Sequence, residues 1–189
     1  MSVLIAGLAV FLGAHSIGIF FPNVRARMVG RLGEGPWKAG YSLISLAGFV
    51  LLIYGFGLAR QAPLVLYSPA SWLRKVTFLF MLPVFPMLLA AYLPGKIKTA
   101  TKHPMLAAVK FWAFGHLLAN GTLADVLLFG GFLAWAIADR MSLKRRPAAI
   151  ETVAPGKFND LIAVVLGIAL YVLFIGWAHV RLFGVSPLG

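Results

Sequence analysis

Residues 2–21 read SVLIAGLAVFLGAHSIGIFF, an apolar run without a charged side chain. Its length matches the ~20 residues that a helix needs to cross ~30 Å of hydrocarbon. Further apolar runs follow at 39–59, 74–93, 104–121, 123–139 and 159–182, and the short segments between them hold nearly all the charge. In lipid every backbone amide must find its partner within its own segment, so each run is expected to be a helix. The sequence therefore predicts an all-α, polytopic transmembrane helix bundle of about six spans.

The composition predicts one domain. The chain has 189 residues, of which 61% are hydrophobic and 13% aromatic. These values exceed those of soluble domains, and the length leaves no room for a second domain beside six spans. We expect residues 1–189 to form a single transmembrane domain. Because the first run lacks a basic leader and a small-residue cleavage site, we interpret it as a permanent helix rather than a signal peptide.

The basic residues are divided unequally between alternate connecting segments. The net charge is +12, from 17 Lys and Arg against 5 Asp and Glu. Four of the basic residues fall in the segments on the N-terminal side of the membrane, and the segments on the other side hold Arg25, Arg27, Arg31, Lys38, Lys96, Lys98, Lys102, Arg140, Lys144, Arg145, Arg146 and Lys157. This positive-inside bias predicts that both termini are periplasmic. It also favours anionic membrane lipid, not nucleic acid, as the partner of the basic loops.

Local signals refine the predicted helices. Pro83 and Pro86 lie inside the third run, where each removes a backbone hydrogen bond, so a kink or a break is expected there. Thr122 follows a tight Asn-Gly turn and can cap the fifth helix. The pair Gly130-Gly131 is expected to permit close helix contact rather than to bind phosphate.

The absence of cysteine limits the metal chemistry. It excludes disulfides, thiolate ligands, iron–sulfur clusters and covalently attached haem. An ionisable side chain within a membrane segment is costly, so the histidines are the first candidates for function. A histidine that only bonds one helix to another is the alternative for each of them.

Depth along the helices suggests which histidines could share a ligand. His15 lies ~10 Å from the inner end of the first run, and His116 lies ~9 Å beyond Lys110 if Lys110 marks the inner interface. Two imidazoles at matching depth, without thiolates or paired carboxylates, suit the iron of haem b better than zinc or di-iron. Arg25, Arg27 and Lys110 would then meet the haem propionates. If the fourth helix starts at Pro104, His179 is a rival ligand that matches His116 better.

Residues 103–121 read HPMLAAVKFWAFGHLLANG, with two histidines thirteen residues apart and Trp112 between them. Together with Ala14-His15-Ser16, this stretch resembles the NnrU family over nearly the whole chain. The resemblance implies a multi-pass protein of the bacterial inner membrane, associated with denitrification through the reduction of nitrite and nitric oxide. Trp112 would either stack at the haem edge or pack between helices, and His103 would either stabilise the helix start or contact the propionates.

The same family includes zeta-carotene isomerase of plants and cyanobacteria, a membrane protein that binds haem b and converts a cis double bond to trans. The resemblance places its haem histidines at His15 and His116. The isomerase has a cysteine between its motif histidines, implicated in exchange of iron ligands, where this chain has Ala113. A weaker similarity joins Lys102-His103-Pro104 to the Arg-His-Pro motif of isoprenylcysteine-type methyltransferases, but the Glu and Tyr pattern expected downstream is missing.

These observations lead to three functional hypotheses. The first is a haem b protein with His15 and His116 as iron ligands, serving nitrogen-oxide or related redox metabolism together with an electron donor or respiratory partner protein. The second is a haem-dependent cis–trans isomerase of a lipophilic, carotenoid-like polyene. The third is a non-haem assembly partner of a respiratory oxidoreductase. A Soret band in the absorption spectrum separates the first two from the third.

Overall fold

Helices account for most of the chain, as the apolar runs predict. The structure, a computed structural model, describes residues 1–145 and 155–188. It is 82% helical with no strand in these ranges, which confirms the all-α prediction. Five helical stretches are long and apolar enough to span a membrane, and one shorter apolar helix covers Pro104–Ala119. Arg146, expected in the last inner segment, lies outside the described residues.

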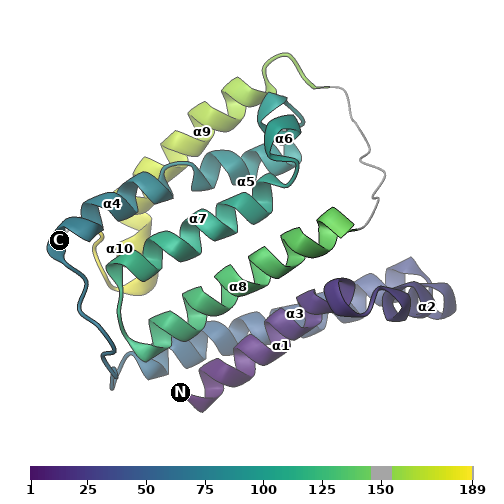
Figure 1. Cartoon of the computed structure of the whole chain (residues 1–189), viewed down its shortest axis with the longest axis horizontal. Helices are drawn as coiled ribbons and strands as arrows, with labels where there is room; N and C mark the ends of the chain where they lie inside the picture. Colours follow the sequence, from purple (N-terminus) through teal and green to yellow (C-terminus); the bar gives the residue numbers. More distant parts are fainter. Residues whose placement is uncertain (146–154, 189) are drawn as a thin grey trace. The chain divides into compact units, whose positions relative to one another are not determined.

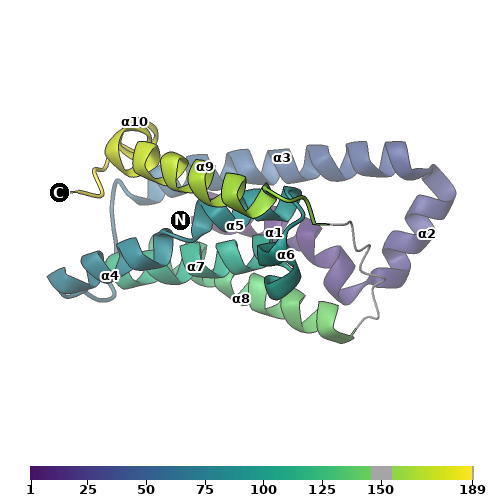
Figure 2. The ribbon, with the colours of Figure 1, turned by 90° about the horizontal axis from the view of Figure 1, so that it is seen from above.

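Internal contacts divide the chain into two units, which Figures 1 and 2 show from two directions. The first unit comprises residues 1–69 and 120–145, with α1 (Ser2–Phe20), α2 (Pro22–Leu32), α3 (Glu34–Ala59) and α8 (Leu123–Arg145). The second comprises residues 70–119 and 155–188, with α4 (Ser71–Met81), α5 (Val84–Tyr92), α6 (Lys96–Thr101), α7 (Pro104–Ala119), α9 (Asn159–Leu173), the π-helix η1 (Phe174–Ala178) and α10 (His179–Phe183). The prediction of a single domain stays a prediction.

In the first unit α1 packs against α3 at backbone distance. A Cβ placed on Gly7 would lie 2.6 Å from the backbone nitrogen of Leu52, and one on Gly48 would lie 2.7 Å from that of Phe11. A Cβ on Gly55 would likewise collide with the backbone of Leu4. Small residues let helix backbones approach in this way within membranes. The contacts pair the start of α1 with the end of α3, so the two helices are antiparallel.

The other neighbour of α1 is α8, which runs parallel to it. The side chains of Leu8 and Leu12 lie 3.6 and 3.5 Å from where a Cβ of Gly131 would be, an ordinary van der Waals separation, and nothing lies within 4 Å of a Cβ at Gly130. The expectation that the Gly130-Gly131 pair makes a close helix contact is therefore wrong in this unit. The close approaches are made by the isolated glycines of α1 and α3, where the partner's backbone leaves no room for a side chain.

A capping box starts α8. The backbone amide of Asp125 donates to Oγ1 of Thr122 (3.2 Å), and the amide and hydroxyl of Thr122 donate to the Asp125 carboxylate (3.0 and 2.6 Å). This confirms Thr122 as the cap. The preceding turn is held by the extended segment at residues 64–67, since the amides of Leu66 and Tyr67 both donate to the carbonyl of Gly121.

Within the first unit the basic residues gather where α1 and α8 end and α3 begins. The amphipathic helix α2 joins α1 to α3 at this end, as Figure 2 shows, and no residue of α2 is buried. Basic residues near this end are Arg25, Arg27, Arg31, Lys38, Arg140, Lys144 and Arg145. We call it the basic end of the first unit. An exposed helix with arginines beside apolar side chains is suited to the plane of lipid head groups.

In the second unit α5 packs against α7 on one side and α9 on the other. The helical run breaks at Leu82-Pro83, between α4 and α5, which confirms the predicted interruption. Pro86 then lies against Gly167 of α9, where an added Cβ would meet the proline backbone. Two hydroxyls support the same contacts, because Thr77 donates to the carbonyl of Gly115 and Tyr171 donates to that of Phe78, both at 3.0 Å.

The start of α6 is capped from a distant part of the sequence. The carboxylate of Asp160 accepts hydrogen bonds from the amides of Lys96 (2.7 Å) and Ile97 (3.0 Å). The neighbouring Asn159 side chain donates to the carbonyl of Pro94 at 2.8 Å. These bonds satisfy amides that a helix start otherwise leaves without partners. They fix the beginning of α9 to the connection between α5 and α6.

The glycine contacts predict a difference between two positions of α3. Gly48→Ala should destabilise the fold by about 1–3 kcal/mol, because the Phe11 backbone cannot move aside as a side chain could. A Cβ added at Gly57 would have nothing within 4 Å of it, so Gly57→Ala should change stability by less than ~1 kcal/mol. Thermal unfolding of the detergent-solubilised protein, followed by circular dichroism, checks both. Equal midpoints for the two variants would contradict the packing.

The α6 cap gives a second prediction. Asp160→Ala should lower stability by about 1–2 kcal/mol, because two amides lose their acceptor. The matched control is Glu34→Ala, which removes a carboxylate that pairs with the exposed Lys38 ammonium, 3.0 Å away; its effect should be clearly smaller, because solvent screens an exposed ion pair. Thermal midpoints at neutral pH measure the difference, and an Asp160→Ala midpoint like that of the wild type would refute the capping role.

Candidate functional site

The histidines and their expected companions are distributed over both units. His15 and Arg25 belong to the first unit. His103, Lys110, Trp112, His116 and His179 belong to the second. Among the described residues no group of three or more His, Asp or Glu side chains is arranged to hold a metal ion. The pairing of His15 with His116 stays a prediction.

His15 is fixed in orientation by its own helix. Its Nδ1 lies 2.7 Å from the carbonyl oxygen of Phe11, one turn earlier. Because a carbonyl can only accept, Nδ1 carries the proton, and the lone pair is on Nε2. The imidazole also stacks on the Phe11 ring, with centroids 4.3 Å apart and planes 28° apart. Histidine ligands of metals are commonly oriented by such a bond to a backbone carbonyl.

A pocket of about 270 Å³ opens beside His15 at the basic end of the first unit. The Tyr41 ring lies 5.3 Å from the imidazole, between ring centroids. Arg25 and Lys38 bring two cations to the wall of the pocket. The complete lining is Ala14, His15, Ile17, Gly18, Arg25, Trp37, Lys38 and Tyr41. The volume is at the lower limit for small-molecule sites, ~300 Å³, so it suits the anionic edge of a larger ligand.

One buried donor near His15, Nε1 of Trp135, has no hydrogen-bond partner among the described residues. The Trp135 ring is perpendicular to the imidazole, 6.0 Å away between centroids. A buried donor without a partner costs ~1–3 kcal/mol. Such atoms are expected where a ligand or an ordered water supplies the acceptor.

His116 is oriented in the same manner in the second unit. Its Nδ1 lies 2.8 Å from the carbonyl of Trp112, so the proton is again on Nδ1. The Trp112 ring is 5.4 Å from the imidazole, with the planes tilted by 53°. Trp112 therefore provides both a backbone acceptor and an aromatic neighbour. Next to Trp112 on α7, Ala113 is fully buried, at the position where the resemblance expects a cysteine in the isomerase.

The first residue of α7 affects the depth expected for His116. The helix begins at Pro104, which is the condition under which His179 was expected to match His116. The carbonyl of His103 accepts the amide of Ala107 at 3.1 Å, so His103 lies at the helix start. Lys110 is half-buried within α7. Lys110 therefore does not mark the beginning of this helix.

His179 lies in a separate aromatic cluster. Its Nδ1 donates to the carbonyl of Val185 at 2.7 Å, and its ring lies 5.8 Å from Phe174 and 5.0 Å from Phe183. Figure 2 shows α9 and α10 on one side of α5 and α7 on the other. The pairing of His179 with His116 stays a prediction.

Sequence reasoning missed several residues around His15. It assigned Trp37 and Tyr41 to an interfacial aromatic belt, counted Lys38 only among the basic residues that set the topology, and gave no role to Trp135. One signal was available, because Trp37, Tyr41 and Ser45 recur at four-residue spacing and so follow one face of an otherwise apolar helix. For Trp135 there was no signal, since only packing against α1 brings it to the imidazole.

The helices and the lipid-compatible surface define a polytopic, all-α membrane protein. Within that class, the family described as NnrU protein matches residues 3–187. The chain therefore belongs to the NnrU family, as the motif around His116 indicates. Neither the curated proteins nor the solved structures contain a match to it.

Proposed function

We propose that this member of the NnrU family is a haem b protein of the bacterial inner membrane, in which His15 and His116 would hold the iron. Its role would be electron transfer or redox sensing in nitrite and nitric oxide metabolism. The observation that carries the proposal is the His15 pocket, whose lining combines an oriented imidazole with two cations.

The imidazoles of His15 and His116 fit the iron of haem b. The bond from Nδ1 to the Phe11 carbonyl holds the Nε2 lone pair of His15 ready for a metal and prevents the ring from turning. His116 has the same bond to the carbonyl of Trp112. Neutral imidazoles without thiolates or carboxylates suit haem iron. Haem bound in this way would supply a one-electron Fe(III)/Fe(II) couple.

The positively charged wall of the His15 pocket fits the propionate edge of haem. Arg25 and Lys38 come from the basic end of the first unit, and both would pair with propionate carboxylates. Arg25 is the residue of this pair that the sequence had assigned to the propionates. The buried indole N–H of Trp135, whose ring is 6.0 Å from the imidazole, would donate to such a ligand. Tyr41 and Trp37 supply aromatic surface that excludes water.

Two features favour electron transfer over the alternative chemistries. Iron with two imidazole ligands has no open coordination position for a gas. The ligand exchange implicated in the isomerase needs a cysteine, and the corresponding Ala113 offers no donor atom. The family assignment supports the link to denitrification, and an electron donor or respiratory partner protein would complete the role.

Absorption spectroscopy tests the proposal. The full chain, expressed with a haem precursor and purified in detergent, should show a Soret band that shifts on reduction. His15→Ala and His116→Ala should each lose most of the band. His179→Ala is the matched control and should retain it, because its imidazole bonds to Val185.

The outcomes separate the three hypotheses. A colourless wild-type protein would reject haem and favour the non-haem assembly partner. A band that His179→Ala removes and His15→Ala leaves intact would reject the proposed ligand pair. A normal spectrum with conversion of a cis-polyene to its trans form would favour the isomerase.

A further inference from the structure

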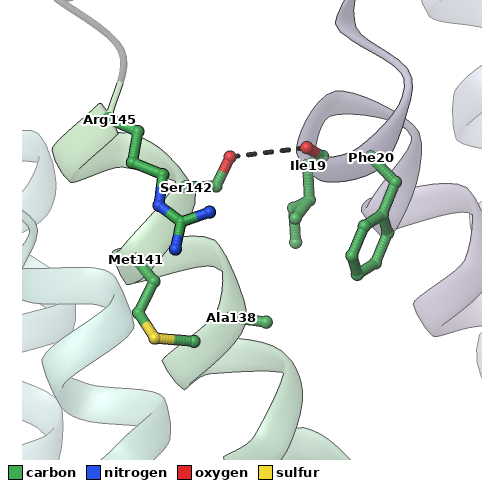
Figure 3. A pocket seen from close by; sticks show the side chains of 6 residues that line it. All are labelled: Ile19, Phe20, Ala138, Met141, Ser142 and Arg145. Carbon is green, nitrogen blue, oxygen red and sulfur yellow. Dashed lines mark hydrogen bonds between the residues drawn. The ribbon is translucent and has the colours of Figure 1, made fainter.

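A second pocket lies between α1 and α8, and its lining shares no residue with that of the His15 pocket. Its volume is about 330 Å³, and Ile19, Phe20, Ala138, Met141, Ser142 and Arg145 line it. Figure 3 shows Ala138, Met141 and Arg145 on the α8 side and Ile19 and Phe20 on the α1 side. The hydroxyl of Ser142 donates to the carbonyl of Ile19 at 3.4 Å across the gap. Both helices belong to the first unit.

The lining combines an apolar wall with one cation. Four of the six side chains are hydrocarbon or thioether, and Arg145 is the charged one. Further positive charge comes from Arg140 and Lys144 on the same part of α8. No acidic side chain belongs to the lining. The pocket is therefore complementary to a molecule with an apolar chain and an anionic group.

The position of the pocket along the helices identifies the source of such a molecule. Ile19 and Phe20 are the last residues of α1, and residues 138–145 form the last two turns of α8. Both helices are long and apolar enough to span a membrane. Arg145 is then at head-group level, while Ala138, about 10 Å earlier along the helix, lies towards the hydrocarbon.

We propose that this pocket binds an anionic phospholipid of the surrounding leaflet. The lipid phosphate pairs with the Arg145 guanidinium, which offers several donors in a planar array. The upper part of one acyl chain lies against Ala138, Met141 and Phe20. The bound lipid fills the gap between the ends of α1 and α8, beside the hydrogen bond from Ser142 to the Ile19 carbonyl. This inference is independent of the proposed haem function.

Lipid binding to variants with altered charge tests the proposed pairing of Arg145 with the lipid phosphate. The full chain, purified in an uncharged detergent, is mixed with phosphatidylglycerol or with phosphatidylcholine of the same acyl chains, and bound lipid is measured by native mass spectrometry. Phosphatidylglycerol should bind more tightly. Arg145→Gln should weaken its binding ~10-fold or more, because a charge-assisted hydrogen bond is lost. Lys144→Gln, next to it but outside the lining, should change binding by less than ~3-fold at physiological salt.

Two substitutions that leave the charge unchanged test the proposed contact with the acyl chain. Ala138→Phe fills the pocket and should abolish tight phosphatidylglycerol binding. Ala134→Phe, at an exposed position one turn earlier on α8, should leave it unchanged. Circular dichroism and thermal unfolding check that both variants fold. If Ala138→Phe does not fold, the Arg145→Gln comparison alone decides.

Three results would overturn the proposal. They are equal affinity for the two lipids, wild-type binding by both Arg145→Gln and Ala138→Phe, and displacement of the lipid by millimolar inorganic phosphate, which would indicate a site for a free anion. Loss of the Soret band in His15→Ala with unchanged lipid binding would support both proposals, because the two pockets would then act separately.

Discussion

The approach of α1 to α3 at backbone distance is the constraint on which the first unit depends. In lipid the exclusion of apolar surface from water does not hold helices together, so van der Waals contact and hydrogen bonds must. Gly7, Gly48 and Gly55 remove the side chains that would keep the two backbones apart. The fully buried Leu4 packs into the contact that results. With α1 fixed in rotation by these glycines, His15 is turned toward Tyr41 of α3 and Trp135 of α8.

The helices of the second unit are also held together by close packing and hydrogen bonds, but through different residues. Its helices meet at Gly115 and Gly167, and the hydroxyls of Thr77 and Tyr171 bond to carbonyls of neighbouring helices. A break at Leu82-Pro83 and a carboxylate cap from Asp160 complete the arrangement. Polar side chains in this unit satisfy backbone groups that lipid cannot, so most of its intramembrane polarity is structural.

The His15 pocket and the α1–α8 pocket both lie near the basic end of the first unit, and their positive charge has different surroundings. In the His15 pocket, two cations lie near an oriented imidazole, which is the basis of the proposed haem site. In the α1–α8 pocket, a lone arginine stands above an apolar wall, which suits a lipid. The basic residues that orient a membrane protein can thus also select its ligands. The lipid proposed for the second site would stabilise the ends of the helices that carry the first.

Much of the fold followed from the sequence. Charge-free runs such as residues 2–21 have only the helix available to them in lipid, so their existence and approximate bounds could be predicted. Pro83 marked the break in the third run, and Thr122 marked the start of α8, because each acts through its own neighbouring backbone. The motif around His116 was likewise enough to indicate the family.

The tertiary structure decided which side chains meet. Gly48 and Gly57 are equivalent in the sequence, yet the Phe11 backbone lies against one of them and open space against the other. Trp135 reaches the imidazole of His15 from α8 only because α1 packs between α3 and α8. His179 was a rival ligand by depth, and only the structure shows that its imidazole bonds to the Val185 carbonyl beside Phe174 and Phe183. A one-dimensional pattern specifies a residue's distance along its helix, but rotation about the helix axis and the choice of neighbour are set by contacts between distant segments.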